Sequence, residues 1–538
     1  MRAVHSLAAM PLAAAIAGLL YLAAVTMRAL RRVASAWCLL SMPTAAVLAY
    51  RLWDHHVGPE SFALWRLELT PHRMAFVLPL AALSPFFVLA SRRGGVRDGK
   101  RSQATSALAC FSVAAALTAA MSDHFFLLAG MCALTTWCFI SVMVLRGSAA
   151  GRSLPWVFPL ALSDLCLALG VLFFYRADPT RGLLFPPAPL RPEGAYAAAC
   201  ALMLAAALLR LGMFPTHLWM PEVSRGGRDI ILVHVLAVDL SLGAFLLFAV
   251  ARLVFVWGGA WTWACLGVAS ISALVVSREL LSAREGGEVT GLLCSSLGAG
   301  LALVAAPGGQ SALAAMRVGL WAGLSAVALV ELGRGATRGG SWFKVVGGAS
   351  LMGMPPLAGF AWLWLGLSAL HGAFSGGTTV LFMACLPLLL AQSWVMGTTS
   401  LLVPKDGETT RGEAWLGALG LTAACVVVGL FPGAMIDLLM REYGLPVELP
   451  VPGWQSLGAA VLLLSVPAAV LLALWAREKE APGMSDVMPP MRALPLLAKG
   501  RFHGRMFAST EKARVALVAC GLLLYIGWAA IMAYLALR

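Results

Sequence analysis

Long apolar stretches follow one another along the chain, separated by short polar segments rich in Gly, Pro and Arg. Most stretches are long enough for an α-helix to cross about 30 Å of hydrocarbon. They lack the strict alternation of apolar and polar residues that a membrane β-barrel requires. The pattern predicts an all-α polytopic membrane protein with about sixteen transmembrane helices, at residues 7–27, 33–50, 73–91, 104–121, 125–145, 154–175, 196–214, 230–250, 254–276, 289–306, 310–331, 343–370, 378–403, 413–436, 455–475 and 514–536.

These helices group into three parts. Residues 1–100 carry the first three helices, and residues 101–440 form a core that contains two interrupted helices. Residues 441–538 carry the last helices, joined by a hydrophilic linker at 477–513. The linker is rich in Pro and charge, which predicts a cytoplasmic or interfacial segment.

The basic charge belongs to the membrane topology. The chain holds 39 Lys and Arg against 25 Asp and Glu, but only 12% of its residues are charged and 60% are hydrophobic. Most of the Lys and Arg fall on one set of alternate loops, which predicts that these loops are cytoplasmic and that both termini lie outside, in a cell (inner) membrane. No basic face with interleaved aromatic residues indicates a nucleic-acid partner.

The composition also limits the chemistry expected of this chain. The 11 Cys are scattered singly, without the spacing of a metal or iron–sulfur site. We find no phosphate-binding glycine motif and no nucleophile–base pair. We therefore expect no catalytic residue, metal or cofactor on this chain, and any reaction would belong to partner subunits.

Two predicted helices are interrupted in ways that a plain membrane anchor would not need. The first break, near 210–230, carries Pro215 and Pro221, and the second, near 347–367, carries Pro355 and Pro356. Proline removes an N–H donor and clashes with the preceding helical turn. Irregular backbone at membrane depth is tolerated where it is buried in protein or lines a wet cavity, and paired broken helices mark ion or substrate sites.

The sequence around these breaks resembles a known superfamily: the antiporter-like membrane subunits of complex I, of Mrp antiporters and of energy-converting hydrogenases. The order and spacing of the matching segments hold over roughly residues 60–440, and the helix count with a long linker before the last helix fits the distal complex I subunit. The matching segments are SDHFFLL at 122–128, LSDLCLALGVLFFY at 162–175, LRLGMFPTHLWMPE at 209–222, MPPLAGF at 354–360 and GLFPGAMIDLL at 429–439.

The resemblance implies an inverted-repeat fold, but this chain departs from the family in the residues that carry protons. The family uses a glutamate on its fifth helix and lysines on later helices. Here the glutamate position falls at or near Ala133, the seventh-helix lysine position is Arg210, and the twelfth-helix lysine position falls near Leu363. Arginine stays charged and cannot release a proton in each cycle. We therefore expect no lysine-type proton pumping through this chain.

Four charged residues, Asp164, Arg210, Asp239 and Arg317, lie in the interior of predicted spans, where each costs about 2.5–3.5 kcal/mol on insertion scales. The resemblance places Asp164 and Arg210 on neighbouring helices, so we expect them to form an ion pair, with Asp239 as the other candidate partner. They are either part of a remnant ion path or a static bridge that fixes helix packing. His234 is either a residue of the wetted path or a satisfied interior histidine. The ion-path candidates are Asp164, Arg210, His234, Asp239 and Arg317.

Charges nearer the membrane surfaces suggest local pairs. We expect Glu222 to meet Arg225 or Arg228, and Glu331 to lie close to Arg334 at an interface. The segment 277–288 is rich in charge and predicts a solvated loop.

The sequence thus supports two functions. The first is a membrane subunit of a proton- or sodium-translocating complex, such as an NADH:quinone oxidoreductase-like one. Its proton path would be degenerate, and other membrane and peripheral subunits would be its partners. The alternative is a non-conducting scaffold that anchors a partner chain, as in an inorganic-carbon uptake system. An unrelated polytopic enzyme is disfavoured, because acidic metal-binding motifs and long catalytic loops are not found.

Overall fold

The computed structural model describes much of the chain up to residue 431, and the described residues all belong to one compact unit. The described residues are 9–27, 30–53, 60–61, 66–67, 71–91, 99–146, 154–179, 184, 193–225, 227–228, 230–254, 260–283, 285–307, 309–334, 341–354, 356–372, 379–402 and 413–431.

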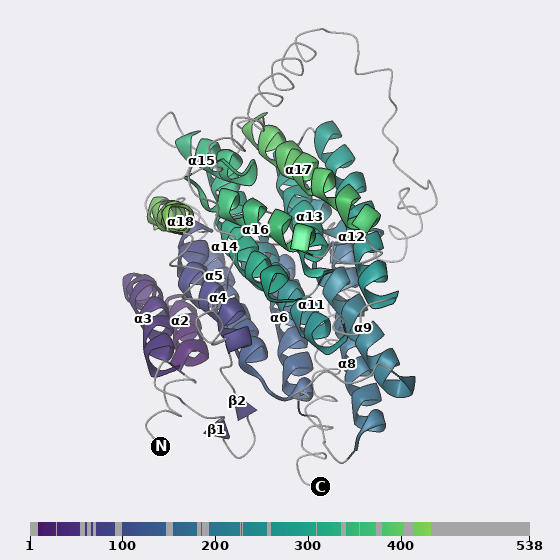
Figure 1. The fold of residues 1–538 in the computed structure, drawn as a ribbon. Helices are drawn as coiled ribbons and strands as arrows, with labels where there is room; N and C mark the ends of the chain where they lie inside the picture. The colour runs from purple at the N-terminus through teal and green to yellow at the C-terminus, as the bar shows by residue number, and fades with distance from the viewer. Residues whose placement is uncertain are drawn as a thin grey trace. The chain divides into compact units, whose positions relative to one another are not determined.

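Helices make up nearly all of this part of the chain (Figure 1). A ribbon of two-residue strands, β1 (Glu60–Ser61) and β2 (Arg66–Leu67), precedes α4. The helices are α2 (Ala9–Ala23), α3 (Leu30–Trp53), α4 (Pro71–Ala90), α5 (Gly99–Met121), α6 (Phe125–Arg146), the 3₁₀-helix η2 (Leu154–Val157), α8 (Phe158–Ala177), α9 (Gly194–Arg210), α10 (Trp219–Ser224), the π-helix η3 (Ile230–Leu240), α11 (Ser241–Val254), α12 (Ala260–Ser282), α13 (Gly286–Ala305), α14 (Gly309–Arg334), α15 (Ser341–Leu351), α16 (Ala358–Gly372), α17 (Thr379–Leu402) and α18 (Glu413–Leu430).

The predicted spans from 7–27 to 413–436 each overlap a helix or a pair of helices. Within the described residues, seven helices are long and apolar enough to cross a membrane, and five further apolar helices are shorter. The predicted helices at 455–475 and 514–536, and the linker at 477–513, lie outside the described residues. The count of sixteen therefore stays a prediction.

Three spans form the interior of the described part of the chain. The spans Ile230–Leu253 and Ala314–Arg334 are buried throughout their most apolar windows, and Gly286–Ala305 nearly so. Small residues allow this close packing: a Cβ at Gly298 would collide with the carbonyl oxygen of Leu211, and one at Gly323 with the side chain of Leu297. Small residues at contact points are how membrane helices bring their backbones together.

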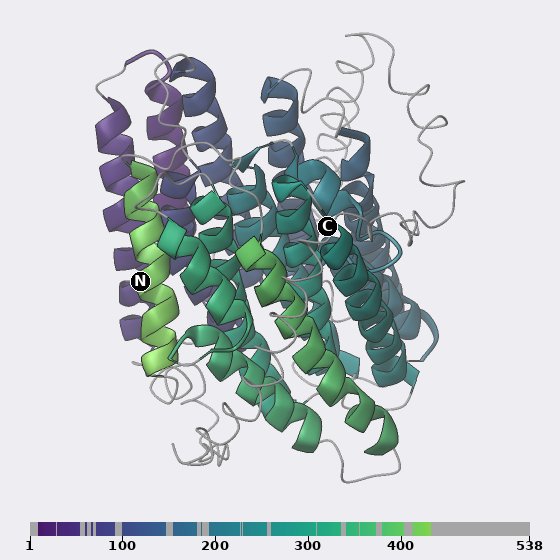
Figure 2. The same ribbon diagram turned by 90° about the horizontal axis from the view of Figure 1, so that it is seen from above.

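Segments far apart in the sequence also pack together. In Figure 2 the light-green helix α18 lies beside the purple N-terminal helices, and α18 packs against α4. Gly417 and Gly420 make this contact possible, because a Cβ at either position would collide with Phe86 or Ala90 of α4.

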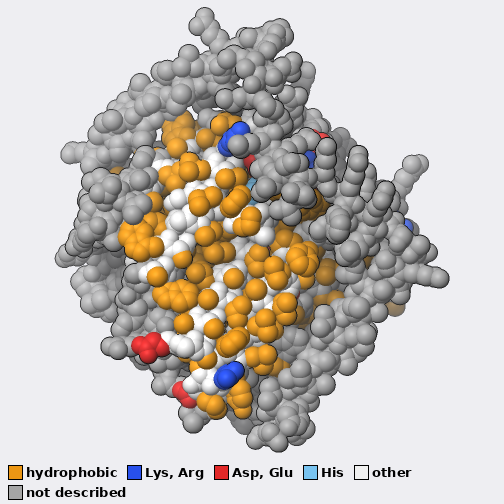
Figure 3. Space-filling model, turned by 90° about the vertical axis from the view of Figure 1, so that its right-hand side faces the viewer, with side chains coloured by type: hydrophobic (Ala, Val, Ile, Leu, Met, Phe, Trp, Pro, Cys, Tyr) orange, Lys and Arg blue, Asp and Glu red, His pale blue; other side chains and the backbone are white. Residues whose placement is uncertain are grey.

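Peripheral helices present apolar side chains to the outside. Figure 3 shows a broad face on which hydrophobic side chains cover the middle, while the visible charged side chains lie toward its edges. Exposed leucines on α8 and α12, such as Leu165, Leu172 and Leu274, belong to such surfaces. This distribution is what a lipid environment favours, since hydrocarbon solvates apolar side chains and excludes charge.

Candidate functional site

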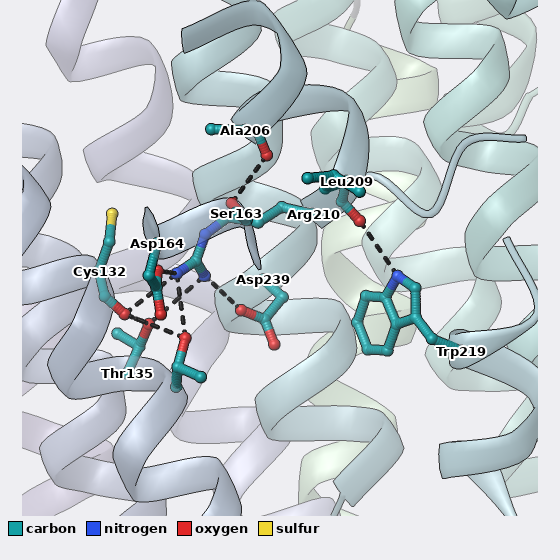
Figure 4. A network of polar contacts seen from close by, with 10 residues as sticks. Cys132, Thr135, Ser163, Asp164, Ala206, Leu209, Arg210, Trp219 and Asp239 are labelled. Carbon is teal, nitrogen blue, oxygen red and sulfur yellow. Dashed lines mark hydrogen bonds and ion pairs between the residues drawn. The ribbon is translucent and has the colours of Figure 1, made fainter. Parts of the chain in front are cut away.

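Arg210 is the centre of a buried charged cluster at the first helix break. It is the last residue of α9, and none of its surface is exposed. Nη2 donates to Oδ1 of Asp164 on α8 at 2.5 Å, and Nη1 donates to Oδ1 of Asp239 on η3 at 2.6 Å (Figure 4). The expected Asp164–Arg210 pair is therefore present. Asp239, the other candidate partner, binds the same guanidinium at the same time.

Helix α6 supplies uncharged oxygens to the same guanidinium. Nη2 donates to the carbonyl of Cys132 at 3.0 Å and to the hydroxyl of Thr136 at 3.2 Å, and Nη1 reaches the Thr135 hydroxyl at 3.5 Å. Sequence reasoning missed these three residues. The signal was the pair of adjacent threonines inside an apolar helix, near the position at which the resemblance would place a glutamate.

The turn after α9 is built to end the helix at Arg210. Gly212 takes a left-handed conformation with φ +64°, which a side chain would strain, and this is how helices commonly end. The indole N–H of Trp219 donates to the carbonyl of Leu209 at 3.1 Å and satisfies one of the free carbonyls at the helix end. A cation at a helix C-terminus is also favoured by the helix dipole.

Neighbouring contacts fix Asp164 and Asp239 against Arg210. The hydroxyl of Ser163 donates to the carbonyl of Ala206 at 2.9 Å and ties α8 to α9 next to Asp164 (Figure 4). On the other side, Gly243 of α11 packs tightly on α9: a Cβ there would lie 3.2 Å from Cβ of Arg210. The positions of all three charged groups are thus set by helix packing.

The cluster carries more acid than base. Two carboxylates face one guanidinium, so a fully ionised cluster has a net charge of −1. Arginine cannot correct this by losing its proton. This surplus negative charge is buried, since Asp239 has 2% and Asp164 has 15% of its side chain exposed.

His234 and Asp239 lie five residues apart on the π-helix. A π-helix bonds residues i and i+5, so this spacing brings two side chains toward the same side of the helix. The His234 ring stacks on Phe139 of α6, with centroids 5.3 Å apart and planes inclined by 8°. The histidine is buried, and neither ring nitrogen has a hydrogen-bond partner among the described residues. His234 is thus a buried histidine packed on an aromatic ring, and its place on a wetted path stays a prediction.

The first break contains a short helix. Helix α10 lies between α9 and Ile230, and Ile230–Leu253 is long enough to be a span of its own. Pro215 lies in the turn before α10, and Pro221 sits in the first turn of α10, where a missing N–H is tolerated. A Cβ at Gly291 of α13 would collide with Pro221, so the break packs directly on α13.

Side chains of the break also contact the core helices. Nε2 of His217 lies 3.0 Å from a carboxylate oxygen of Glu279 on α12. Ser295 of α13 donates to the carbonyl of His217, and the N–H of Phe214 donates to Ser272 of α12 at 2.9 Å. Buried polar atoms of the interrupted backbone are thereby given partners, which irregular structure at membrane depth requires.

The surface charges form the expected pairs and more. Arg225 contacts Glu222 at 2.5 Å, Glu285 at 2.9 Å and Glu288 at 3.4 Å. Burial opposes the charge on Arg225, but these carboxylates outweigh it and raise the pKa of the guanidinium. Glu331 pairs with Arg334 at 2.5 Å as expected, but both side chains are buried in the protein and do not lie on its surface.

The segment 277–288, predicted as a solvated loop, is largely helical. Helix α12 continues to Ser282 and α13 begins at Gly286. The local charge misled the prediction, because these charges are used in pairs between helices.

The second break separates α15 from α16 and is far less polar. Pro356 is exposed and Pro355 lies outside the described residues. On α16, next to the position where a relay lysine was expected, Trp362 is buried and packs against Gly300 and Gly319. Arg317 is fully buried on α14, in the same half of the chain.

Comparisons with known proteins support the resemblance that the motifs suggested. No protein-family model matches the chain. In sequence it is 28% identical over 405 residues to NADH-quinone oxidoreductase subunit N 1 of Solidesulfovibrio magneticus, an alignment covering 68% of this chain and 85% of that protein.

Three solved complexes contain chains of similar structure. The match to the Mrp complex from Dietzia sp. DQ12-45-1b has a TM-score of 0.74 at 17% identity, over 99% of this chain and 63% of that one, so this chain spans less than two thirds of its length. The match to the membrane-bound sulfane sulfur reductase, an archaeal respiratory membrane complex, has a TM-score of 0.69 at 15% identity. It covers 99% of this chain and 95% of that one. The match to respiratory complex I from Thermus thermophilus has a TM-score of 0.61 at 20% identity. It covers 79% of this chain and 99% of that one.

In sequence the chain is thus similar to NADH-quinone oxidoreductase subunit N 1, and in fold it is similar to chains of the Mrp complex, of the sulfane sulfur reductase and of complex I. It is a multi-pass membrane protein by its apolar helices and by these similarities.

Proposed function

We propose that this chain is a membrane subunit of an ion-translocating complex that resembles complex I, Mrp or hydrogenase membrane arms. Its path is a modified one, in which an arginine held by two carboxylates replaces the lysine relay of the family. The observation that carries this proposal is the buried cluster of Asp164, Arg210 and Asp239 at the first helix break. A chain that only spanned the bilayer would not bear the cost of three buried ionisable groups.

The two halves of the chain have different parts in this proposal. The first half keeps a charged cluster beside the unpartnered His234. In the second half, Trp362 fills the space between Gly300 and Gly319 near the expected lysine position. A close-packed indole stands there in place of a titratable relay group, so ion movement is proposed for the first half only.

The energy-supplying reaction is proposed to belong to partner chains. The exposed apolar side chains of the outer helices suit contact with lipid and with protein neighbours. We propose that the basic loops face the cytoplasm of a cell with the chain in its inner membrane, and that other membrane and peripheral subunits complete the assembly.

A second candidate function is a non-conducting scaffold. The observation that favours it is the number of groups that hold Arg210, since two carboxylates and three oxygens of α6 make a rigid clamp. In this case the cluster would fix α6, α8, α9 and η3 against one another and would not move an ion.

The proposal is tested by purifying the chain from native membranes in mild detergent and identifying the co-purifying chains by mass spectrometry. Redox, hydrogenase-type or antiporter partners in stoichiometric amounts are expected. A zinc-containing partner of a carbon-hydration system would favour the scaffold. Recovery of the chain alone would overturn the assembly.

A further inference from the structure

The surplus negative charge of the cluster needs a counter-charge. A buried ionised carboxylate without a partner is costly enough that such groups usually take up a proton instead. Arg210 is already shared by both acids, and it cannot change its charge. The geometry therefore demands that one of the two carboxyl groups hold a proton whenever no other cation is present.

The two acids are not equally suited to remain ionised. Asp164 pairs with Arg210, also hydrogen-bonds the side chain of Thr136, and keeps 15% of its side chain exposed. Asp239 pairs with the same guanidinium but has only 2% of its side chain exposed, on a span whose most apolar window is buried throughout. Hydrogen bonds and partial solvation stabilise an anion. They favour Asp164 as the ionised member of the pair.

We propose that Asp239 carries the exchangeable proton of this site. The proton is bound to a carboxyl oxygen of Asp239 while Asp164 and Arg210 form a neutral ion pair. When it leaves, the O–H bond breaks, the carboxylate is re-formed, and the proton passes to a neighbouring base or water. The assignment rests on the proposed function for its role in transport, but not for the location of the proton.

The groups around Asp239 are consistent with this assignment. Its charged and titratable neighbours on packed elements are Asp164 of α8, Arg210 of α9 and the thiol of Cys132 on α6. His234 lies on the same π-helix, and Arg146 at the end of α6 acts on that histidine. The other helices packed on η3 carry further ionisable groups, namely Arg73 of α4, Arg101 of α5, Glu222 of α10, Arg252 of α11, Glu288 of α13, and Arg317, Glu331 and Arg334 of α14.

Infrared spectroscopy of the full-length chain in lipid nanodiscs tests the proposal, because a protonated carboxyl group has its own C=O stretching band and Asp and Glu absorb at different positions. The wild type is expected to show such a band at neutral pH. Asp239→Glu should move it, whereas Asp164→Glu should leave it in place. Asp164→Asn should abolish it, since Asp239 then forms a balanced pair with Arg210.

The control is Asp123→Asn, which removes a carboxylate paired with Arg73 outside the spans and should leave the band unchanged. Retained elution as a single species shows that each variant is folded, and the conservative Glu variants keep the test usable if Asn variants are unstable. A band that moves with Asp164→Glu, or no band assignable to either residue, would overturn the assignment. Neither result depends on partner chains, so the assignment and the proposed function fail independently.

Discussion

Replacing Arg210 with Met gives the sharpest prediction about stability. The substitution keeps an unbranched side chain of similar length but removes the cation that holds Asp164 and Asp239 together. Removing one partner of a buried ion pair costs about 3–5 kcal/mol, because the other charge stays buried without compensation. The hydrogen bonds to Cys132 and Thr136 are lost as well, but energies within one network do not add, so we expect a total within that range.

The same reasoning predicts a rescue. In the triple variant Arg210→Met, Asp164→Asn and Asp239→Asn, no charge remains to be desolvated. Replacing a whole buried ion cluster with uncharged groups is often neutral or stabilising. The triple variant should therefore recover most of the stability that the single variant loses. Arg210→Lys should fall between wild type and Arg210→Met, because an ammonium keeps the charge but cannot reproduce the planar, forked contacts.

The assay is unfolding of the purified chain in mixed micelles with an increasing fraction of denaturing detergent, followed by tryptophan fluorescence. The free energies of unfolding of the variants are compared under identical lipid and salt conditions. A loss of under about 1 kcal/mol for Arg210→Met would mean that the cluster is wet and its charges are solvated. A triple variant as unstable as Arg210→Met would mean that the loss in free energy of unfolding comes from the lost packing of the arginine side chain and not from unpaired charge.

Three further substitutions test the packing of the first break and the turn between α5 and α6. Gly291→Ala should destabilise the chain by about 1–3 kcal/mol, because its methyl group would collide with Pro221, whereas Gly130→Ala on α6, with nothing within 4 Å, should be neutral or slightly stabilising in the same unfolding assay. Burial lowers the pKa of the His124 imidazole, although Asp123 opposes the shift. The folded state is therefore favoured by the neutral imidazole above the unfolded pKa of 6.5. This contribution to the free energy of unfolding is lost as the pH falls through the lower pKa of the folded state. Unfolding measured from pH 7 to below the folded pKa should therefore show a weaker loss of stability in His124→Asn than in wild type, and parallel curves would contradict the assigned cause.

Much of the fold could be predicted because apolar length and proline position are local signals. The helix ends at Arg210 and Leu351 follow from Gly and Pro nearby, and the spans follow from the length of each apolar run. The extent of α10 and the helical character of 277–282 were missed. Both depend on packing: α10 is held by Gly291 of α13, and the charges around α12 and α13 are paired with Arg225.

The candidate site was partly predictable for a related reason. Asp164, Arg210 and Asp239 stand out because charge inside an apolar helix is rare and expensive. That both acids bind one guanidinium could not be foreseen, because it depends on the π-helical stretch Ile230–Leu240, whose sequence reads as an ordinary apolar helix. The contribution of α6 rests on a carbonyl and two hydroxyls, which have no distinctive sequence signature.

The most direct test of the account is proton flux through the native assembly reconstituted in lipid vesicles, measured with a pH-sensitive dye inside them. We expect flux in the wild type, its reduction to the level of empty vesicles in Asp239→Asn, and wild-type flux in Arg225→Ala, which changes only the surface cluster. Wild-type flux in Asp239→Asn would show that the ion takes another route. No flux in the wild type would leave the chain as a scaffold built on the same fold.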